Sequence, residues 1–163
     1  LLSTGHQPVL RFERHLAKPI DAVWRALTDP DELQKWFPCT VVEPQWQVGE
    51  ALTFSFPDHP DLDFAGTVLE IDPPNVLAFT WGDDSLRFEL TATPDGGTDL
   101  ALIDQLPANI AARNAAGWDV CLDRLALGDD ADGEWQPRFD RYTKAFEPEL
   151  GPQEGPPAGF EEG

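Results

Sequence analysis

Residues 98–125, TDLALIDQLPANIAARNAAGWDVCLDRL, decide the fold. In the first part of this stretch polar and apolar side chains alternate, as in a β-strand with one buried face, and the inward side chains are Thr98, Leu100, Leu102 and Asp104. After Pro107 the apolar period becomes that of a helix, on a stripe made of Ala111, Asn114, Trp118, Cys121, Leu122 and Leu125. The stretch therefore predicts a strand followed by a helix of about twenty residues, which Gly128 can end.

Upstream of this stretch the chain keeps a period of two from Cys39 to Asp104, with turn residues at regular intervals. Prolines and glycines mark the turns at residues 72–75 and 94–97. Between the turns, the inward positions hold large apolar side chains, namely Leu52, Phe54, Phe56, Leu77, Phe79, Trp81, Leu86, Phe88 and Leu90. Consecutive strands joined by short turns indicate an antiparallel meander.

The beginning of the chain predicts one more strand and two short helices. Residues 10–16 alternate as a strand, and Pro19 suits the first turn of a helix that carries Ile20, Val23, Trp24 and Leu27. Asp29 is a candidate N-cap, and Pro30 is a suitable first residue for a second short helix with Leu33, Trp36 and Phe37.

These elements predict an α+β protein. A curved antiparallel sheet of about six to seven strands would need a cover over its aromatic face, and the helix after Pro107 is the only element large enough to provide it. Gly117 lies in the middle of that helix, which suggests close approach by another element. A second stripe predicts a short terminal helix packed on the body, with Trp135, Phe139, Tyr142 and Phe146.

The chain divides into one folded unit with two ends. Its 163 residues fit a single domain. We expect an N-terminal extension over residues 1–8, a folded domain over residues 9–146, and a tail over residues 147–163. The tail is rich in Glu, Pro and Gly and has no Lys or Arg, so we expect it to be flexible.

Composition excludes several classes of function. A net charge of −19 and a pI near 4.2 disfavour binding to nucleic acids and to anionic membranes. No apolar run is long enough to cross a bilayer and no signal peptide is evident, so we expect a cytoplasmic protein without membrane insertion. The charge could reflect a salt-adapted host or a basic partner, but solubility is the simplest interpretation. Cys39 and Cys121 lack the spacing of a disulfide framework or zinc site and are interpreted as small buried hydrophobes.

The motifs together resemble a known family. They are residues 19–30 with the run Val23-Trp24-Arg25-Ala26-Leu27-Thr28-Asp29-Pro30, then Leu33, Lys35-Trp36-Phe37, Gly66-Thr67-Val68, Glu70, Asp72-Pro73-Pro74, Phe79-Thr80-Trp81, Gly97-Thr98, Gly117-Trp118, Leu122 and Leu125. Over about residues 9–146 the chain resembles the helix-grip fold of the START/Bet v 1-like superfamily, and within it the activator of Hsp90 ATPase homolog 1-like family.

The resemblance implies an apolar cavity between the sheet and the long helix. Related proteins hold lipids, sterols, polyketides or other hydrophobic molecules there, and some are cyclases or dehydratases that use polar cavity residues. The protein that gives the family its name is an Hsp90 co-chaperone. The resemblance therefore also implies a chaperone partner, and this is the implication to which we give the least weight.

The predicted cavity consists of side chains that face inward on the expected register, namely Trp36, Phe54, Phe56, Phe79, Trp81, Phe88, Leu102, Asp104, Asn114, Trp118 and Leu122. The alternative is that the rings fill a solid core. Asp104 could be a desolvated carboxyl with a raised pKa, or a carboxylate in water at a strand end. Asn114 could face the cavity or make a local hydrogen bond, and Arg14 could be a cavity cation or part of an ion pair.

Metal and cofactor sites are not expected. His6, His15 and His59 are separated in sequence, and the acidic loop with Asp58, Asp61 and Asp63 lacks the EF-hand pattern, although it could hold a cation weakly. The sequence has no GxSxG motif, phosphate-binding glycine loop or dinucleotide fingerprint, which argues against hydrolase, NTPase and Rossmann-type functions.

Three functions follow from the sequence. The first is a binding or carrier protein for a small hydrophobic ligand, such as a lipid or a polyketide-like molecule, without catalysis. The second is a cyclase- or dehydratase-like enzyme that uses Asp104 or Arg14 in the cavity. The third is a stress-response module that interacts with an Hsp90-type chaperone through its acidic face. Ring edges on the terminal helix could also pair two copies in a homodimer.

Overall fold

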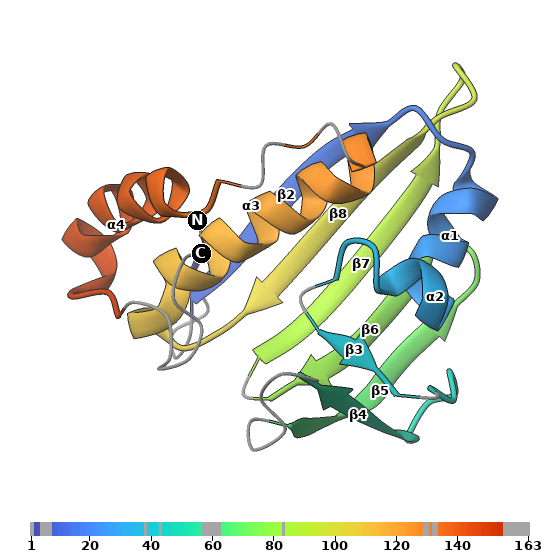
Figure 1. The fold of residues 1–163 in the computed structure, drawn as a ribbon, viewed down its shortest axis with the longest axis horizontal. Coiled ribbons are helices and arrows are strands. Elements are labelled where there is room, and N and C mark those ends of the chain that lie inside the picture. Colours follow the sequence, from blue (N-terminus) through green and yellow to red (C-terminus); the bar gives the residue numbers. More distant parts are fainter. Residues whose placement is uncertain are drawn as a thin grey trace.

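The protein is described by a computed structural model that covers residues 2–3, 8–37, 39–42, 44–56, 63–82, 84–128, 131 and 134–154. Its strands form one antiparallel sheet with the order β1-β2-β8-β7-β6-β5-β4-β3 (Figure 1). The strands are β1 (Leu2–Ser3), β2 (Pro8–Leu16), β3 (Thr40–Val41), β4 (Ala51–Ser55), β5 (Phe64–Asp72), β6 (Val76–Trp81), β7 (Asp84–Ala92) and β8 (Thr98–Gln105).

The topology confirms the predicted meander, because β3 to β8 are neighbours in sequence order. The first long strand, β2, pairs with the last strand, β8, so that Phe12 lies opposite Leu102. The described sheet has eight strands, whereas the sequence predicted about six to seven. The additional strands are short, since β1 and β3 contain only two residues each. The predicted helix-grip fold of the α+β class is confirmed.

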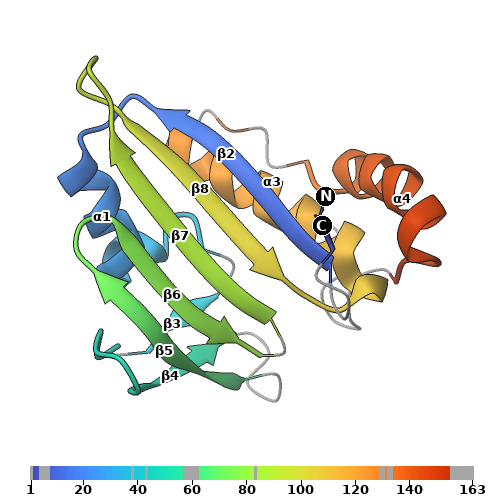
Figure 2. The ribbon, with the colours of Figure 1, turned by 180° about the vertical axis from the view of Figure 1, so that it is seen from behind.

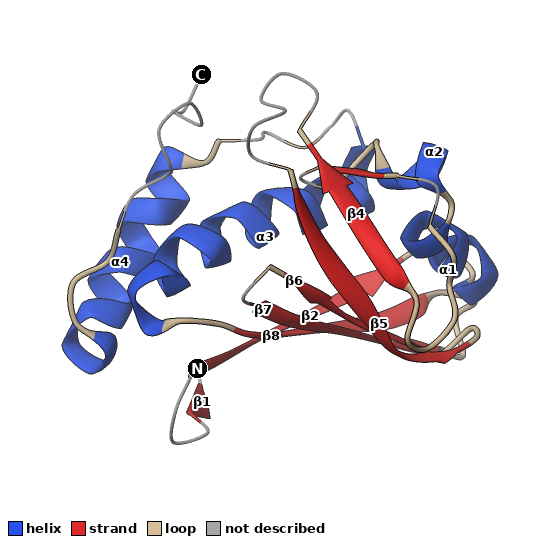
Figure 3. Ribbon diagram, turned by 90° about the horizontal axis from the view of Figure 1, so that it is seen from below, coloured by secondary structure: helices blue, strands red, loops and turns tan. Residues whose placement is uncertain are grey.

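The helical elements are α1 (Ile20–Thr28), α2 (Pro30–Leu33), the 3-10 turn η2 (Ala108–Ile110), α3 (Ala111–Leu127) and α4 (Gln136–Leu150). Helices α1, α2 and α3 lie on the inner side of the curled sheet, and α4 lies beside α3 (Figure 3). From behind, the outer face of the sheet is visible along β2, β8, β7 and β6, with α3 on the far side (Figure 2). The long helix α3 therefore covers the concave face, as predicted.

The local signals at the short helices have the expected physical basis. The Asp29 carboxylate accepts a hydrogen bond from the Asp31 backbone N–H at 2.9 Å, and Pro30 is the first residue of α2. Pro19 is at the N-cap position of α1, one residue before the turn in which it was predicted. Because α2 ends at Leu33, Trp36 and Phe37 lie just beyond it rather than within it.

The ends of the predicted domain differ in part from the sequence expectation. Helix α4 continues to Leu150, four residues past the predicted boundary at 146, and residues 151–154 return to the start of α3. Phe146 is buried on the body, as expected of the terminal helix. The part of the tail from 155 to 163 lies outside the described residues, so the expected flexibility there stays a prediction.

Two glycines have opposite surroundings. A Cβ added to Gly66 would collide with the Thr80 backbone oxygen and come within 2.9 Å of the Phe54 ring. A Cβ added to Gly117 would meet no atom of the described neighbouring elements within 4 Å. The prediction that another element approaches Gly117 closely is therefore wrong, because the space beside this part of α3 is open.

These surroundings predict opposite effects of alanine. Gly117→Ala should stabilise the protein by about 0.5–1 kcal/mol, because alanine restricts the unfolded chain and suits a helix interior. Gly66→Ala should destabilise it, because the Thr80 backbone cannot move without disturbing the pairing of β5 and β6. Urea unfolding of both variants measures these changes, and a Gly117→Ala variant less stable than wild type would contradict the account.

Candidate functional site

The side chains predicted to line a cavity meet in one layer between the sheet and α3. Eight of them are buried, and Phe56, Trp81 and Asn114 are half-buried. The buried ones are Trp36, Phe54, Phe79, Phe88, Leu102, Asp104, Trp118 and Leu122. Strands β4, β6, β7 and β8 supply the floor of this layer, α3 supplies its roof, and the segment after α2 closes one side with Trp36. Whether this layer accommodates a ligand stays a prediction.

The aromatic rings form a continuous network across the layer. The rings of Trp81 and Trp118 lie 5.3 Å apart between centroids, which joins the sheet to α3. Phe37 lies 5.6 Å from Trp118 and 6.2 Å from Trp81, so it contacts both. Phe37 also contacts the rings of Trp36, Phe54 and Phe79. From the sequence, Phe37 was predicted to lie on a helix but was not included in the site. Its position next to Trp36 in the family motif could have indicated that it belongs there.

Two carboxyl groups lie at the polar end of this layer. Asp104, on β8, is completely buried, and Asp84, at the start of β7, is 4% exposed. The Trp118 indole Nε1 donates to Asp104 Oδ2 at 2.9 Å, and the Asn114 amide Nδ2 donates to Asp84 Oδ2 at 2.9 Å. The alternative in which Asp104 sits in water is therefore wrong, and Asn114 bonds across layers rather than locally. The cavity residues predicted from the sequence did not include Asp84, which the structure places at the start of β7.

Burial and mutual repulsion give these carboxyls an unusual protonation state. Burial raises the pKa of Asp104 well above its ordinary value, and the charge of Asp84 and a hydrogen bond between the two carboxyls raise it further. The Trp118 hydrogen bond opposes this shift. The pair therefore retains a proton that an exposed aspartate would release. A protonated carboxyl in an apolar layer can donate a hydrogen bond or a proton to a bound molecule.

Arg14 was predicted to be either a cavity cation or part of an ion pair, and the structure shows the ion pair. Its guanidinium lies 2.7 Å from the Asp119 carboxylate of α3, and Arg141 of α4 binds the other oxygen of the same carboxylate at 2.9 Å. Asp119 thus connects β2, α3 and α4. Because Arg14 is held at this junction, the structure does not support its use as a catalytic cation.

The remaining titratable candidates are structural. Cys39 and Cys121 are free and buried, and burial raises the pKa of each thiol to about 12, so neither is a reactive thiolate at neutral pH. Among the described residues, no group of three His, Cys, Asp or Glu side chains could hold a metal ion. His6, Asp58, His59 and Asp61 lie outside the described residues.

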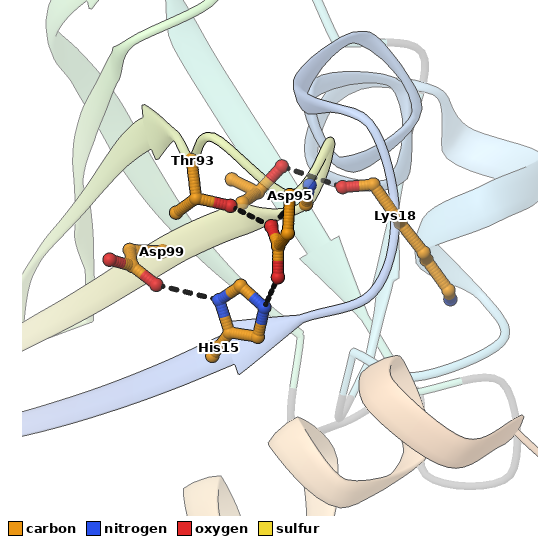
Figure 4. Close-up of polar contacts among 7 residues, drawn as sticks. His15, Lys18, Thr93, Asp95 and Asp99 are labelled. Atoms are coloured by element: carbon orange, nitrogen blue, oxygen red, sulfur yellow. Dashed lines mark hydrogen bonds and ion pairs between the residues drawn. The ribbon is translucent and has the colours of Figure 1, made fainter.

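A polar cluster on the outer face of the sheet connects β2 to the turn between β7 and β8 (Figure 4). His15 Nδ1 lies 2.8 Å from Asp99 Oδ1, and His15 Nε2 lies 2.9 Å from Asp95 Oδ2. The Asp95 carboxylate also accepts hydrogen bonds from the Thr93 hydroxyl and, at 2.9 Å, from the Gly97 N–H. The hydrogen bond that His15 donates to Asp99 is the largest of the effects that raise the pKa of His15.

A polar hollow of about 370 Å³ lies beside this cluster, lined in part by His15, Asp99, Glu89 and Thr91. Its charges are already paired, since Arg87 binds Glu89 at 2.7 Å and His15 binds Asp99. We therefore interpret the cluster as a connection between strands and the aromatic layer as the candidate site.

The family of this chain follows from its match to a known family model. The family model described as activator of Hsp90 ATPase homolog 1-like protein matches residues 17–127. The chain belongs to the activator of Hsp90 ATPase homolog 1-like family. This result confirms the resemblance stated from the sequence motifs. No curated protein matches the chain.

Solved structures share the fold of this family member. A conserved protein of unknown function from Enterococcus faecalis is 21% identical and has a TM-score of 0.74, with 88% of this chain and 86% of that chain covered. A protein from Bordetella parapertussis is 26% identical and has a TM-score of 0.69, with 87% and 86% covered. CalU16 from Micromonospora echinospora is 22% identical and has a TM-score of 0.67, with 87% and 88% covered.

These likenesses support the fold, and the expectations about ligands, partners and location stay predictions. No helix within the described part of the chain could span a membrane. The cytoplasmic location, the lack of nucleic-acid binding, a chaperone partner and a homodimer all remain expectations from the sequence.

The buried carboxyl pair predicts a specific pH dependence of stability. Because the pKa of Asp104 is raised in the folded state, its contribution is most favourable below the ordinary value of about 4 and is lost as the pH rises toward the raised pKa. Asp104→Asn should flatten this decline in the free energy of unfolding, whereas Asp72→Asn, at an exposed position, should not. Urea unfolding across this pH range measures both, and an unchanged decline in Asp104→Asn would refute the shared-proton account.

The His15 cluster on the outer face predicts a second pH dependence, in which the titrating group is a base rather than an acid. The pKa of His15 should lie above 6.5, so its bonds to Asp95 and Asp99 stabilise the fold below that value and weaken as the pH rises through the raised pKa. NMR titration of the imidazole should show this shift in wild type and a smaller one in Asp99→Asn. A His15 pKa at or below 6.5 would show that the two carboxylates do not hold the imidazolium.

Proposed function

We propose that this family member binds a small, predominantly apolar molecule between the sheet and α3. The observation that carries the proposal is the aromatic network that joins the two layers, with Trp81 of the sheet 5.3 Å from Trp118 of α3. Ligand sites are mostly apolar with a few polar groups that fix orientation. The layer has this composition, because Asp84, Asp104 and Asn114 are its polar members at one end.

The apolar surface that a small ligand would bury sets its expected affinity. A ligand that buries about 400 Å² of apolar surface gains about 10 kcal/mol at roughly 25 cal/mol per Å². Lost translational and rotational freedom offsets at least about 4 kcal/mol of this gain. The remainder corresponds to a Kd on the order of tens of micromolar. Tighter binding would require a ligand that also satisfies the carboxyl pair.

A second candidate function is cyclase- or dehydratase-like catalysis, and the burial of Asp104 specifically favours it. A buried carboxyl with a raised pKa holds its proton to a higher pH than an exposed one and can act as a general acid toward a bound carbonyl or hydroxyl group. In a dehydration, Asp104 would give its proton to the leaving hydroxyl, and the ionised Asp84, held by Asn114, would take a proton from the neighbouring carbon, so that a C=C bond forms, water leaves and the pair again holds one proton. The binding function does not require this step, so binding is the first proposal.

The binding proposal predicts saturable uptake of a neutral apolar fluorophore. N-phenyl-1-naphthylamine should bind with 1:1 stoichiometry and quench tryptophan fluorescence by energy transfer. Leu122→Phe should weaken this binding at least about fivefold, because the larger ring takes up space between α3 and the sheet that the bound molecule would fill. Leu127→Phe is the matched control, since it makes the same change on the same helix at a side chain that is 55% exposed.

Two results would contradict the proposal. One is the absence of saturable binding to the wild-type protein, and the other is equal weakening by Leu122→Phe and Leu127→Phe. Circular dichroism and urea unfolding of each variant show that both remain folded under the conditions of the titration.

A further inference from the structure

The segment that follows α4 is fastened to the start of α3. The Gln153 side chain accepts a hydrogen bond from the Ala112 N–H at 2.8 Å and donates to the Ala108 carbonyl at 2.9 Å. Glu154 repeats this pattern beside it, since its N–H donates to the Asn109 carbonyl at 2.8 Å and its carboxylate accepts from the Asn109 amide. Figure 1 shows the chain returning from the end of α4 toward the beginning of α3.

These contacts replace a cap that α3 does not have in its own sequence. The first N–H groups of any α-helix have no partner within the helix and need an acceptor. The N-cap residue of α3 is Ile110, whose apolar side chain cannot accept a hydrogen bond. The amide oxygen of Gln153, more than forty positions along the chain, takes that place on the Ala112 N–H.

A line of polar side chains leads from this segment to the buried carboxyl pair. Arg113 is half-buried, burial lowers its pKa, and the charges of Glu154 and Asp84 oppose that effect, so the guanidinium lies in the field of both carboxylates. The next residue, Asn114, donates directly to Asp84. One turn later on α3, Trp118 donates to Asp104. The start of α3 therefore connects residues 153–154 with the polar end of the aromatic layer.

The segment is built to detach without disturbing α4. Its contacts with the start of α3 are hydrogen bonds, Pro152 and Glu154 are exposed, and Leu150 packs against the core and anchors the helix end. Gly151 follows with a φ of 84°, a left-handed conformation that glycine adopts without strain. A change of the Gly151 backbone angles can therefore move residues 152–154 away from α3 without moving α4.

We propose that residues 151–154 form a strap that ties the start of α3 to the end of α4, and that release of the strap frees the start of α3 to move and opens the Asp84 end of the aromatic layer to its ligand. The second part of this inference rests on the proposed binding function, whereas the first part does not. The strap thus sets the rate of ligand exchange more than the affinity. Because it docks on both the ligand-bound and the ligand-free protein, its release changes the association and dissociation rates together and leaves their ratio nearly constant.

The test combines hydrogen exchange with probe kinetics on the full chain. Gln153→Ala removes the acceptor and both donors of the side chain, and Gln136→Ala is the control, since Gln136 makes an exposed hydrogen bond to Asp140 within α4, far from the start of α3 in sequence. In Gln153→Ala, amide exchange in the first turn of α3 should become about tenfold faster, with no change at residues 120–125. The association and dissociation rates of N-phenyl-1-naphthylamine should rise together, with a nearly constant Kd. Gln153→Glu keeps the acceptor for the Ala112 N–H and should restore part of the protection.

The outcomes separate the two parts of the inference from the proposed function. Equal amide exchange in Gln153→Ala and Gln136→Ala would overturn the strap. Faster exchange of the first turn with unchanged probe kinetics would overturn its control of the opening. If the probe does not bind wild type, the proposed function fails, and the strap is then decided by hydrogen exchange alone.

Discussion

A sheet that buries one face must be covered, and in this protein one helix covers the concave face. The inward side chains of β4, β6, β7 and β8 are large and apolar, so they lose contact with water only when α3 lies across them. The indole of Trp118 is the centre of this contact, because it packs on Trp81 and Phe37 and donates to Asp104. The rest of the molecule serves to position α3: Arg14 and Arg141 bind its Asp119, and Lys18 donates to its Leu125 carbonyl.

The same packing creates an unfavourable feature of the interior. Two carboxyls, Asp84 and Asp104, are enclosed where water cannot solvate their charges, and they are tolerated only with a retained proton and donors from Asn114 and Trp118. Apolar residues of similar size would be expected to serve stability at least as well. A polar pair at the end of an aromatic layer therefore fits a role in orienting or transforming a bound molecule.

Much of the fold was predictable because its signals are local. Strand alternation, the change of period at Pro107 and the Asp29-Pro30 cap each depend on residues that are neighbours in sequence. The candidate site was only partly predictable. Alternation assigns Asp104 to the inner face but does not give its depth, which is set by α3 and by Asp84 on the neighbouring strand. The role of Gln153 was not predictable, since its partners at Ala108 and Ala112 are distant in sequence and the composition around it is that of a flexible tail.

The most direct test of the central claim uses the six tryptophans of the chain as reporters. Their indole N–H groups are expected to give separate NMR signals, including three from the aromatic layer at Trp36, Trp81 and Trp118 and one from Trp135 at the N-cap of α4. Titration with N-phenyl-1-naphthylamine should shift the three signals of the layer in a saturable manner and leave the Trp135 signal in place. Unchanged signals from the layer, or shifts confined to Trp135, would show that the space between the sheet and α3 does not bind apolar molecules.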